Sequence, residues 1–75
     1  MEYQYLVQLK GNGIESMRLL TIKNLFKLAN LKPERMEIYF VCFGNDPRRM
    51  RYGFDGTTLY LYDRYGNVFD KYSKN

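Results

Sequence analysis

Residues 49–62 read Arg-Met-Arg-Tyr-Gly-Phe-Asp-Gly-Thr-Thr-Leu-Tyr-Leu-Tyr, and this stretch decides the fold. Polar and apolar residues alternate on both sides of Asp55-Gly56, a dipeptide that is typical of two-residue hairpin turns. We therefore expect two antiparallel strands joined by a tight turn at these two residues. In that register the facing pairs are Phe54–Thr57, Tyr52–Leu59, Arg51–Tyr60 and Arg49–Tyr62.

The two faces of this hairpin differ in chemistry. Successive side chains of a strand point to opposite faces of its sheet, so alternate residues belong together. One face is apolar, is expected to join the core, and consists of Met50, Tyr52, Phe54, Leu59 and Leu61. The other face places guanidinium groups beside phenol rings. Together with the adjacent Arg48 it is the candidate binding surface, which consists of Arg48, Arg49, Arg51, Tyr60 and Tyr62.

The first half of the chain predicts two strands and a helix. Residues 2–9 alternate as a half-buried strand does, residues 11–13 (Gly-Asn-Gly) form a turn, and residues 14–20 can return as a second strand. Thr21 is a plausible N-cap, and Pro33 ends the helix. A rival interpretation is one longer helix over residues 15–31. The shorter helix is favoured by the turn, and its apolar stripe is Ile22, Leu25, Phe26 and Ala29.

The remaining segments predict a central strand and a last strand. Residues 36–43 form an apolar run, interrupted at Glu37, that suits a strand buried on both faces. Residues 44–47 form a loop, residues 63–66 form a second turn, and residues 68–72 form the last strand. Its register stays open, because loops of three and of four residues place Phe69 on opposite faces.

These elements predict an α+β fold in a single small domain that spans residues 1–75. The order is β-β-α-β-β-β-β, with a mostly antiparallel sheet and one helix packed on one face. One helix covers only one face of such a sheet, so the other face is left open for use. The residues expected to be least exposed are Leu25, Phe26, Ile38, Phe40, Leu59 and Leu61.

The composition argues against an enzyme. The chain has no histidine, which removes the usual general base and the commonest metal ligand. The single cysteine, Cys42, is interpreted as a small buried hydrophobic residue, and no cofactor or metal is expected. The carboxylates have structural explanations. Asp46, Asp55 and Asp63 are expected to cap turns, and Glu34 and Glu37 to be solvated.

The charge is compatible with an anionic partner. The net charge is +4, and the one dense basic cluster contains Arg48, Arg49 and Arg51. Lys23 and Lys27, one helical turn apart, form a secondary basic surface that is expected to be a solvated face. The N-terminus lacks the pattern of a signal peptide and no apolar run is long enough to span a membrane, so we expect a soluble, cytoplasmic protein with no membrane partner.

Two functional hypotheses follow for the Arg/Tyr face. The first is a small non-enzymatic inhibitor, adaptor or regulator that binds a larger protein, because Tyr and Arg are enriched in interface hot spots. Small accessory proteins of phages and plasmids fit that description. The alternative is binding of a nucleic acid or nucleotide, with the arginines on phosphates and the tyrosines stacked on bases. Self-association into a homodimer through the same face is compatible with either hypothesis.

Overall fold

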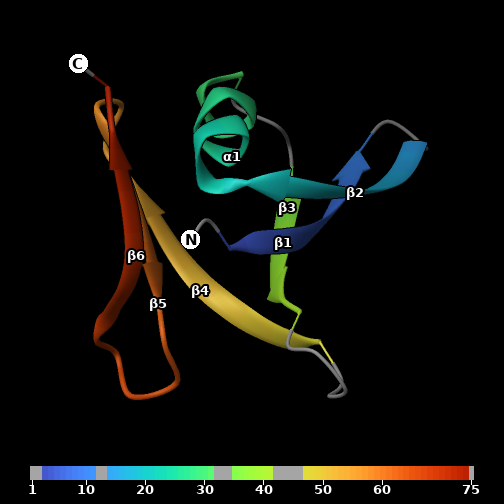
Figure 1. Cartoon of the computed structure of the whole chain (residues 1–75). Coiled ribbons are helices and arrows are strands. Elements are labelled where there is room, and N and C mark those ends of the chain that lie inside the picture. The colour runs from blue at the N-terminus through green and yellow to red at the C-terminus, as the bar shows by residue number, and fades with distance from the viewer. Residues whose placement is uncertain (1–2, 12–13, 32–34, 42–46, 75) are drawn as a thin grey trace.

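The chain forms one helix and six antiparallel strands within residues 3–11, 14–31, 35–41 and 47–74, which the computed structural model describes. The strand order is β2-β1-β3-β4-β5-β6 in a single curled sheet (Figure 1). The predicted α+β class and element order are therefore confirmed. The elements are β1 (Gln4–Gly11), β2 (Ile14–Thr21), α1 (Ile22–Asn30), β3 (Arg35–Phe40), β4 (Arg48–Phe54), β5 (Thr58–Tyr62) and β6 (Val68–Ser73).

The sheet curls far enough to bring β1 and β6 together across its interior. Three strands of the sheet separate β1 from β6, yet the Tyr5 hydroxyl donates a 2.7 Å hydrogen bond to Oδ2 of Asp70. The rings of Tyr3 and Phe69 also lie 5.3 Å apart. The helix contacts β2, β5 and β6, so it lies between the two edge strands and covers the concave face (Figure 1). The concave face and the helix together enclose the core.

Helix α1 packs on the sheet with the predicted apolar stripe. Ile22, Leu25, Phe26 and Ala29 are all buried, as their helical spacing indicated. Thr21 has extended N-cap dihedrals, but its side chain makes no capping hydrogen bond. The segment before the helix is β2, so the rival helix over residues 15–31 is wrong. Pro33, the expected helix stop, lies outside the described residues.

The core contains most of the residues expected from the sequence. Leu25, Phe26, Ile38, Leu59 and Leu61 are buried, together with Tyr5 and Val7 from β1. Phe40 is only partly buried, so its prediction was too strong. It lies at the end of β3 in an aromatic cluster, with its ring centroid 4.9 Å from that of Phe69 and 5.5 Å from that of Tyr3.

Strand β3 differs from the predicted span of residues 36–43, of which residues 42 and 43 lie outside the described residues. It begins at Arg35 and ends at Phe40, and Val41 is already exposed. Met36, Glu37 and Ile38 are consecutive buried residues, so the strand is covered on both faces in this part. The solvated position predicted for Glu37 is wrong, because the side chain is 7% exposed and forms an ion pair with Arg49. Cys42 and the loop aspartate Asp46 lie outside the described residues.

The β4–β5 hairpin is present, but its predicted register is wrong by two residues. The observed pairs place Arg51 opposite Tyr62 and Phe54 opposite Leu59. The reason is the Asp55 carboxylate, whose Oδ1 accepts hydrogen bonds from the backbone N–H groups of Thr57 and Thr58 at 2.8 and 2.7 Å. The Asp55 N–H in turn donates to the Thr58 carbonyl at 3.3 Å, so the tight turn is centred one residue later than expected, on Gly56 (φ +94°) and Thr57.

A β-bulge decides the register of β6. Leu61 faces Asp70 and Tyr62 faces Val68, which leaves Phe69 as the extra residue on β6. The bulge places Asp70 beside buried Leu61 on the concave face, within reach of Tyr5. The preceding turn is capped by Asp63 as predicted, since its Oδ1 accepts hydrogen bonds from the N–H groups of Tyr65 and Asn67.

We expect Tyr5→Phe to destabilise the fold by about 2 kcal/mol, because the Asp70 carboxylate would lose a partner inside a partly buried site. Urea unfolding measures the change. The matched control is Tyr65→Phe, whose hydroxyl accepts an exposed hydrogen bond from Arg64 and should matter by less than about 0.5 kcal/mol. Equal losses in the two variants would show that the Tyr5–Asp70 contact does not hold the sheet closed.

The β4–β5 turn should weaken in acid. The N–H groups of Thr57 and Thr58 hold the pKa of Asp55 below its ordinary value of 3.8. A lowered pKa contributes stability above the unfolded-state pKa, and this contribution is lost as pH falls through the lower folded-state pKa. Asp55→Asn removes this titration. We therefore expect the wild type to lose more thermal stability than Asp55→Asn between about pH 5 and about pH 2. Parallel melting curves for the two proteins would contradict the assignment.

Candidate functional site

The face of the sheet opposite α1, here called the outer face, brings together the predicted Arg/Tyr residues of β4 and β5. Arg51 faces Tyr62 across the two strands. Tyr60 and Tyr62 stack on each other along β5, with ring centroids 6.3 Å apart and an angle of 19° between the planes. Both tyrosines are partly buried, whereas Arg51 is exposed. The faces were predicted correctly because a register error of two residues leaves every side chain on its own face.

Arg49 lies on the same outer face, but the residues that it pairs with belong to β3 and not to β5. It faces Tyr39 of β3, and its Nη2 lies 3.5 Å from Oε2 of Glu37. Glu37 is almost fully buried, so the ion pair compensates a charge that would be costly to bury alone. Arg49 is therefore partly committed to the structure, while its side chain remains 63% exposed.

Arg48 does not join this cluster. It faces Phe40 at the start of β4 and, by alternation along the strand, lies on the face opposite to that of Arg49. There it lines a cavity of about 320 Å³ beside Phe40 and Phe69, and Arg49 and Tyr62 also contribute to the lining of this cavity. The sequence placed the three arginines together, and the structure divides them.

Gly53 is a structural element of the outer face that the sequence interpretation missed. It faces Tyr60, and a Cβ at this position would lie 3.3 Å from the hydroxyl oxygen of Tyr62. The absence of a side chain therefore leaves room for the Tyr62 ring to lean across β4. An isolated glycine inside a strand pattern is the signal that indicated such a close approach.

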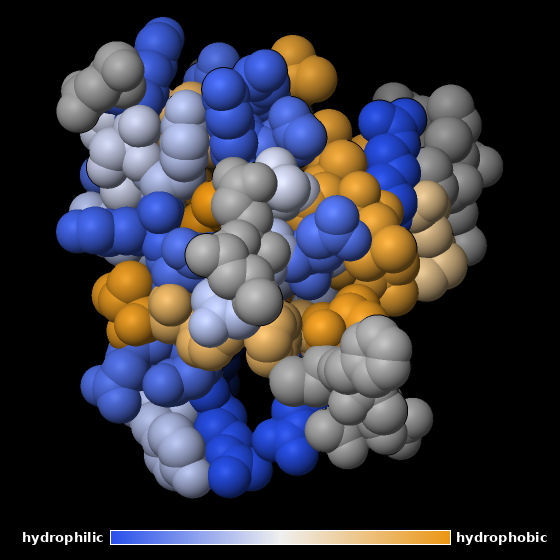
Figure 2. All heavy atoms as spheres, in the orientation of Figure 1, coloured by the Kyte–Doolittle hydropathy of each residue, from blue (hydrophilic) through white to orange (hydrophobic). Residues whose placement is uncertain are grey.

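The outer face continues from the Arg/Tyr residues into an apolar surface that the sequence interpretation also missed. The strand registers align one row across β2, β1, β3 and β4 that consists of Leu19, Leu6, Tyr39 and Arg49. Leu19 is 57% exposed, and Met17 on the same face of β2 is 60% exposed. Figure 2 shows hydrophobic side chains at the surface over β1 and β2. The alternation of Met17 and Leu19 with Arg18 and Leu20 was the available signal.

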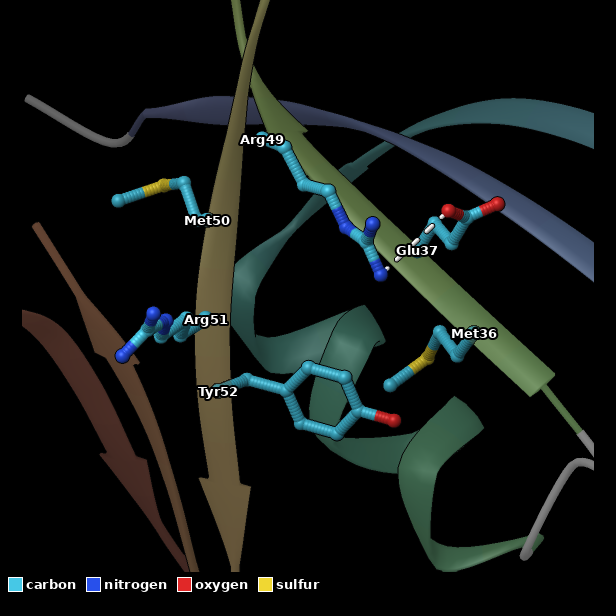
Figure 3. A pocket seen from close by; sticks show the side chains of 6 residues that line it. All are labelled: Met36, Glu37, Arg49, Met50, Arg51 and Tyr52. Carbon is cyan, nitrogen blue, oxygen red and sulfur yellow. Dashed lines mark ion pairs between the residues drawn. The ribbon is translucent and has the colours of Figure 1, made fainter. Parts of the chain in front are cut away.

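A cleft opens where β3 and β4 diverge. The two strands pair only from Ile38–Met50 to Phe40–Arg48, after which β4 turns away to pair with β5. The resulting cleft has a volume of about 560 Å³ and is open to solvent. Figure 3 shows the Tyr52 ring directed toward Met36 and Arg49 directed toward Glu37. The lining residues are Met36, Glu37, Arg49, Met50, Arg51 and Tyr52.

The secondary basic surface lies elsewhere. Lys23 and Lys27 are exposed on α1 and line a shallow groove of about 350 Å³ with Tyr72 and Lys74, on the helix side of the molecule. Lys27 is in the last helical turn, where a positive charge interacts favourably with the helix dipole. This position agrees with the solvated helix face that the sequence predicted.

Comparison with known proteins gives no relative, since no family model, curated protein or solved structure matches the chain. Among the described residues no group of three or more metal-ligating side chains comes together. In the same part of the chain, α1 is too short and too polar to cross a membrane. Any functional conclusion therefore depends on the outer face and the cleft themselves.

The Gly53–Tyr62 contact predicts that the effect of a Gly53 substitution on the free energy of unfolding depends on the Tyr62 ring. Gly53→Val places a Cβ against the Tyr62 hydroxyl, so we expect no gain in stability in the wild type. In a Tyr62→Ala background the same change should stabilise by about 1 kcal/mol, because a β-branched residue suits a strand better than glycine does. Urea unfolding of the four proteins gives the coupling between the two sites. Equal effects in both backgrounds would show that the ring does not occupy the space above Gly53.

Proposed function

We propose that the chain is a small non-enzymatic interaction protein, an inhibitor, adaptor or regulator, that binds the acidic surface of a larger protein through its outer face. One observation carries the proposal. The single described helix covers the concave face, whereas no described helix packs on the outer face, where a row of exposed Leu19 and partly buried Leu6 and Tyr39 leads to Arg49. We place this activity in the cytoplasm, since one cysteine permits no internal disulfide.

The composition of the outer face supports a protein partner. Interface centres are rich in Tyr, Arg and Met and poor in acidic side chains. The described outer face of β3 to β6 combines Tyr39, Tyr60 and Tyr62 with cations, and its buried acid, Glu37, is paired with Arg49. The remaining exposed cations on the outer face of these strands are Arg35, Arg51 and Lys71. An acidic partner surface with apolar residues at its centre is complementary to this arrangement.

The same geometry gives less support to nucleic acid. Tyr60 and Tyr62 stack on each other and are partly buried, so their rings present little free face to a base. Arg48 lies on the opposite face, and Arg49 already has a carboxylate partner. The number of cations available for phosphates on the outer face is therefore smaller than the sequence suggested.

The test of this proposal is a pair of charge reversals on opposite faces of the molecule. Arg51→Glu with Lys71→Glu alters the outer face, and Lys23→Glu with Lys27→Glu makes the same change in net charge on the helix side. Arg49 is left intact, because a glutamate there would face the buried Glu37. We expect the outer-face variant to bind the partner at least about tenfold more weakly, and the helix-side variant to bind it as the wild type does.

The partner is first captured from extract of the source cell, with nuclease-treated and untreated halves. It is then purified and titrated against each variant by calorimetry at low and physiological salt. A protein interface centred on tyrosines should change modestly with salt. If nuclease treatment abolishes the capture and the binding affinity falls steeply with salt, the ligand is instead a nucleic acid. Loss of binding in the helix-side variant alone would move the site to α1.

A further inference from the structure

The cleft between β3 and β4 has backbone edges on both of its walls. Hydrogen-bonded and non-hydrogen-bonded pairs alternate along an antiparallel ladder, and the Asp55 N–H bonds the Thr58 carbonyl. By alternation, Gly53 and Arg51 direct their backbone groups toward β5, whereas Tyr52 and Phe54 direct theirs away from it. In this part of β4 the structure describes no strand pairing on that side, because the β3–β4 ladder ends at Met50.

The β3 wall of the cleft also directs backbone groups toward a position where the structure describes no strand pairing. Its ladder with β4 ends at Ile38, and by the same alternation Met36 directs its N–H and C=O groups toward β4. Met36 on one wall and Tyr52 on the other line the cleft of about 560 Å³, which lies within the volume range of ligand-binding pockets. Phe54 continues the same edge of β4 beyond the lining residues. Strand edges that have no pairing within the described residues are templates for an additional strand.

The side chains around the cleft define what such a strand would carry. By strand alternation, Arg51 and the ion pair of Arg49 with Glu37 lie at the cleft on the outer face, whereas Met36, Met50 and Tyr52 lie on the concave face. A strand between β3 and β4 would direct alternate side chains to these two faces. One set would meet guanidinium groups and the other set would meet thioethers and a phenol ring.

We infer that the cleft binds an extended segment of a partner protein in which acidic and apolar residues alternate, as an added strand between β3 and β4. The inference rests on the proposed function, since it names the kind of segment that the acidic partner presents. Backbone hydrogen bonds to Tyr52 and Phe54 supply affinity, and the alternation of charge supplies specificity. The cleft therefore favours a segment whose acidic residues point to the outer face and whose apolar residues point to the concave face.

Amide hydrogen exchange tests the added strand directly. The probe is a short synthetic peptide of alternating glutamate and valine with blocked ends, added to ¹⁵N-labelled protein. At saturation we expect exchange at Tyr52 and Phe54 to slow at least about tenfold. The amides of Arg51 and Gly53 already face β5 and serve as internal controls, with little further change. A lysine–valine peptide, and a glutamate–valine peptide with alternate amides N-methylated, should give no protection.

Two substitutions at Tyr52 distinguish the contribution of its backbone N–H to peptide binding from that of its side chain. Tyr52→Ala removes the ring and keeps the N–H, whereas Tyr52→Pro removes both, and proline is tolerated where the N–H of a strand is not paired. We expect Tyr52→Pro to bind the peptide at least about fivefold more weakly than Tyr52→Ala, which corresponds to one lost hydrogen bond. Equal affinities, or binding of the peptide without protection of Tyr52 and Phe54, would overturn the added strand.

The two proposals fail in different ways. If the captured partner binds Tyr52→Pro as tightly as Tyr52→Ala, the cleft inference is wrong and docking through the outer face stands. If the partner is unaffected by Arg51→Glu with Lys71→Glu, the proposed function is wrong. Protection of Tyr52 and Phe54 that rises with protein concentration alone would assign the cleft to a second copy of this chain and overturn the inference.

Discussion

The hydrogen bond from Tyr5 to Asp70 is the constraint on which the shape of the molecule depends. Its two partners are 65 residues apart in the chain and lie on β1 and β6, and no local preference brings them together. Burial and the bond to Asp70 raise the pKa of the Tyr5 phenol well above its ordinary value, so the hydroxyl remains a donor at every physiological pH. A buried phenol and a partly buried carboxylate are tolerated only when they satisfy each other. Closing the sheet satisfies both groups.

The closure accounts for the difference between the two faces. The concave face is filled by the buried side of α1, and the outer face has no element of the described chain to cover it. The curl also explains the cleft. Strand β4 pairs with β3 over three residue pairs and with β5 over four, and it cannot follow both neighbours along its whole length. The uncovered apolar row and the open strand edges are therefore two results of the same curvature.

The periodicity of the sequence predicts the elements and their faces. The strand register and the burial of Glu37 depend instead on particular side-chain partners. The helix stripe and the two faces of the β4–β5 hairpin follow from periodicity, which a shift of two residues does not disturb. The register itself depends on the Asp55 carboxylate, which takes the place of a backbone acceptor for Thr58. The burial of Glu37 depends on Arg49 of another strand. Arg48 is separated from Arg49 because adjacent residues of a strand point to opposite faces. The Glu37–Arg49 pair joins two strands, so the periodicity within one strand does not reveal it.

The short β3–β4 ladder also bears on the order in which the chain folds. The β4–β5–β6 meander needs only neighbouring strands, and so does the β1–β2 hairpin. The pairing of β1 with β3 must close over β2 and α1, which makes it the slower event by loop-closure entropy. The backbone ladder between the two halves consists of only three residue pairs, between β3 and β4. This ladder is expected to form late and to open first, while the Tyr5–Asp70 hydrogen bond and the packing of α1 on β5 and β6 still hold the two halves together.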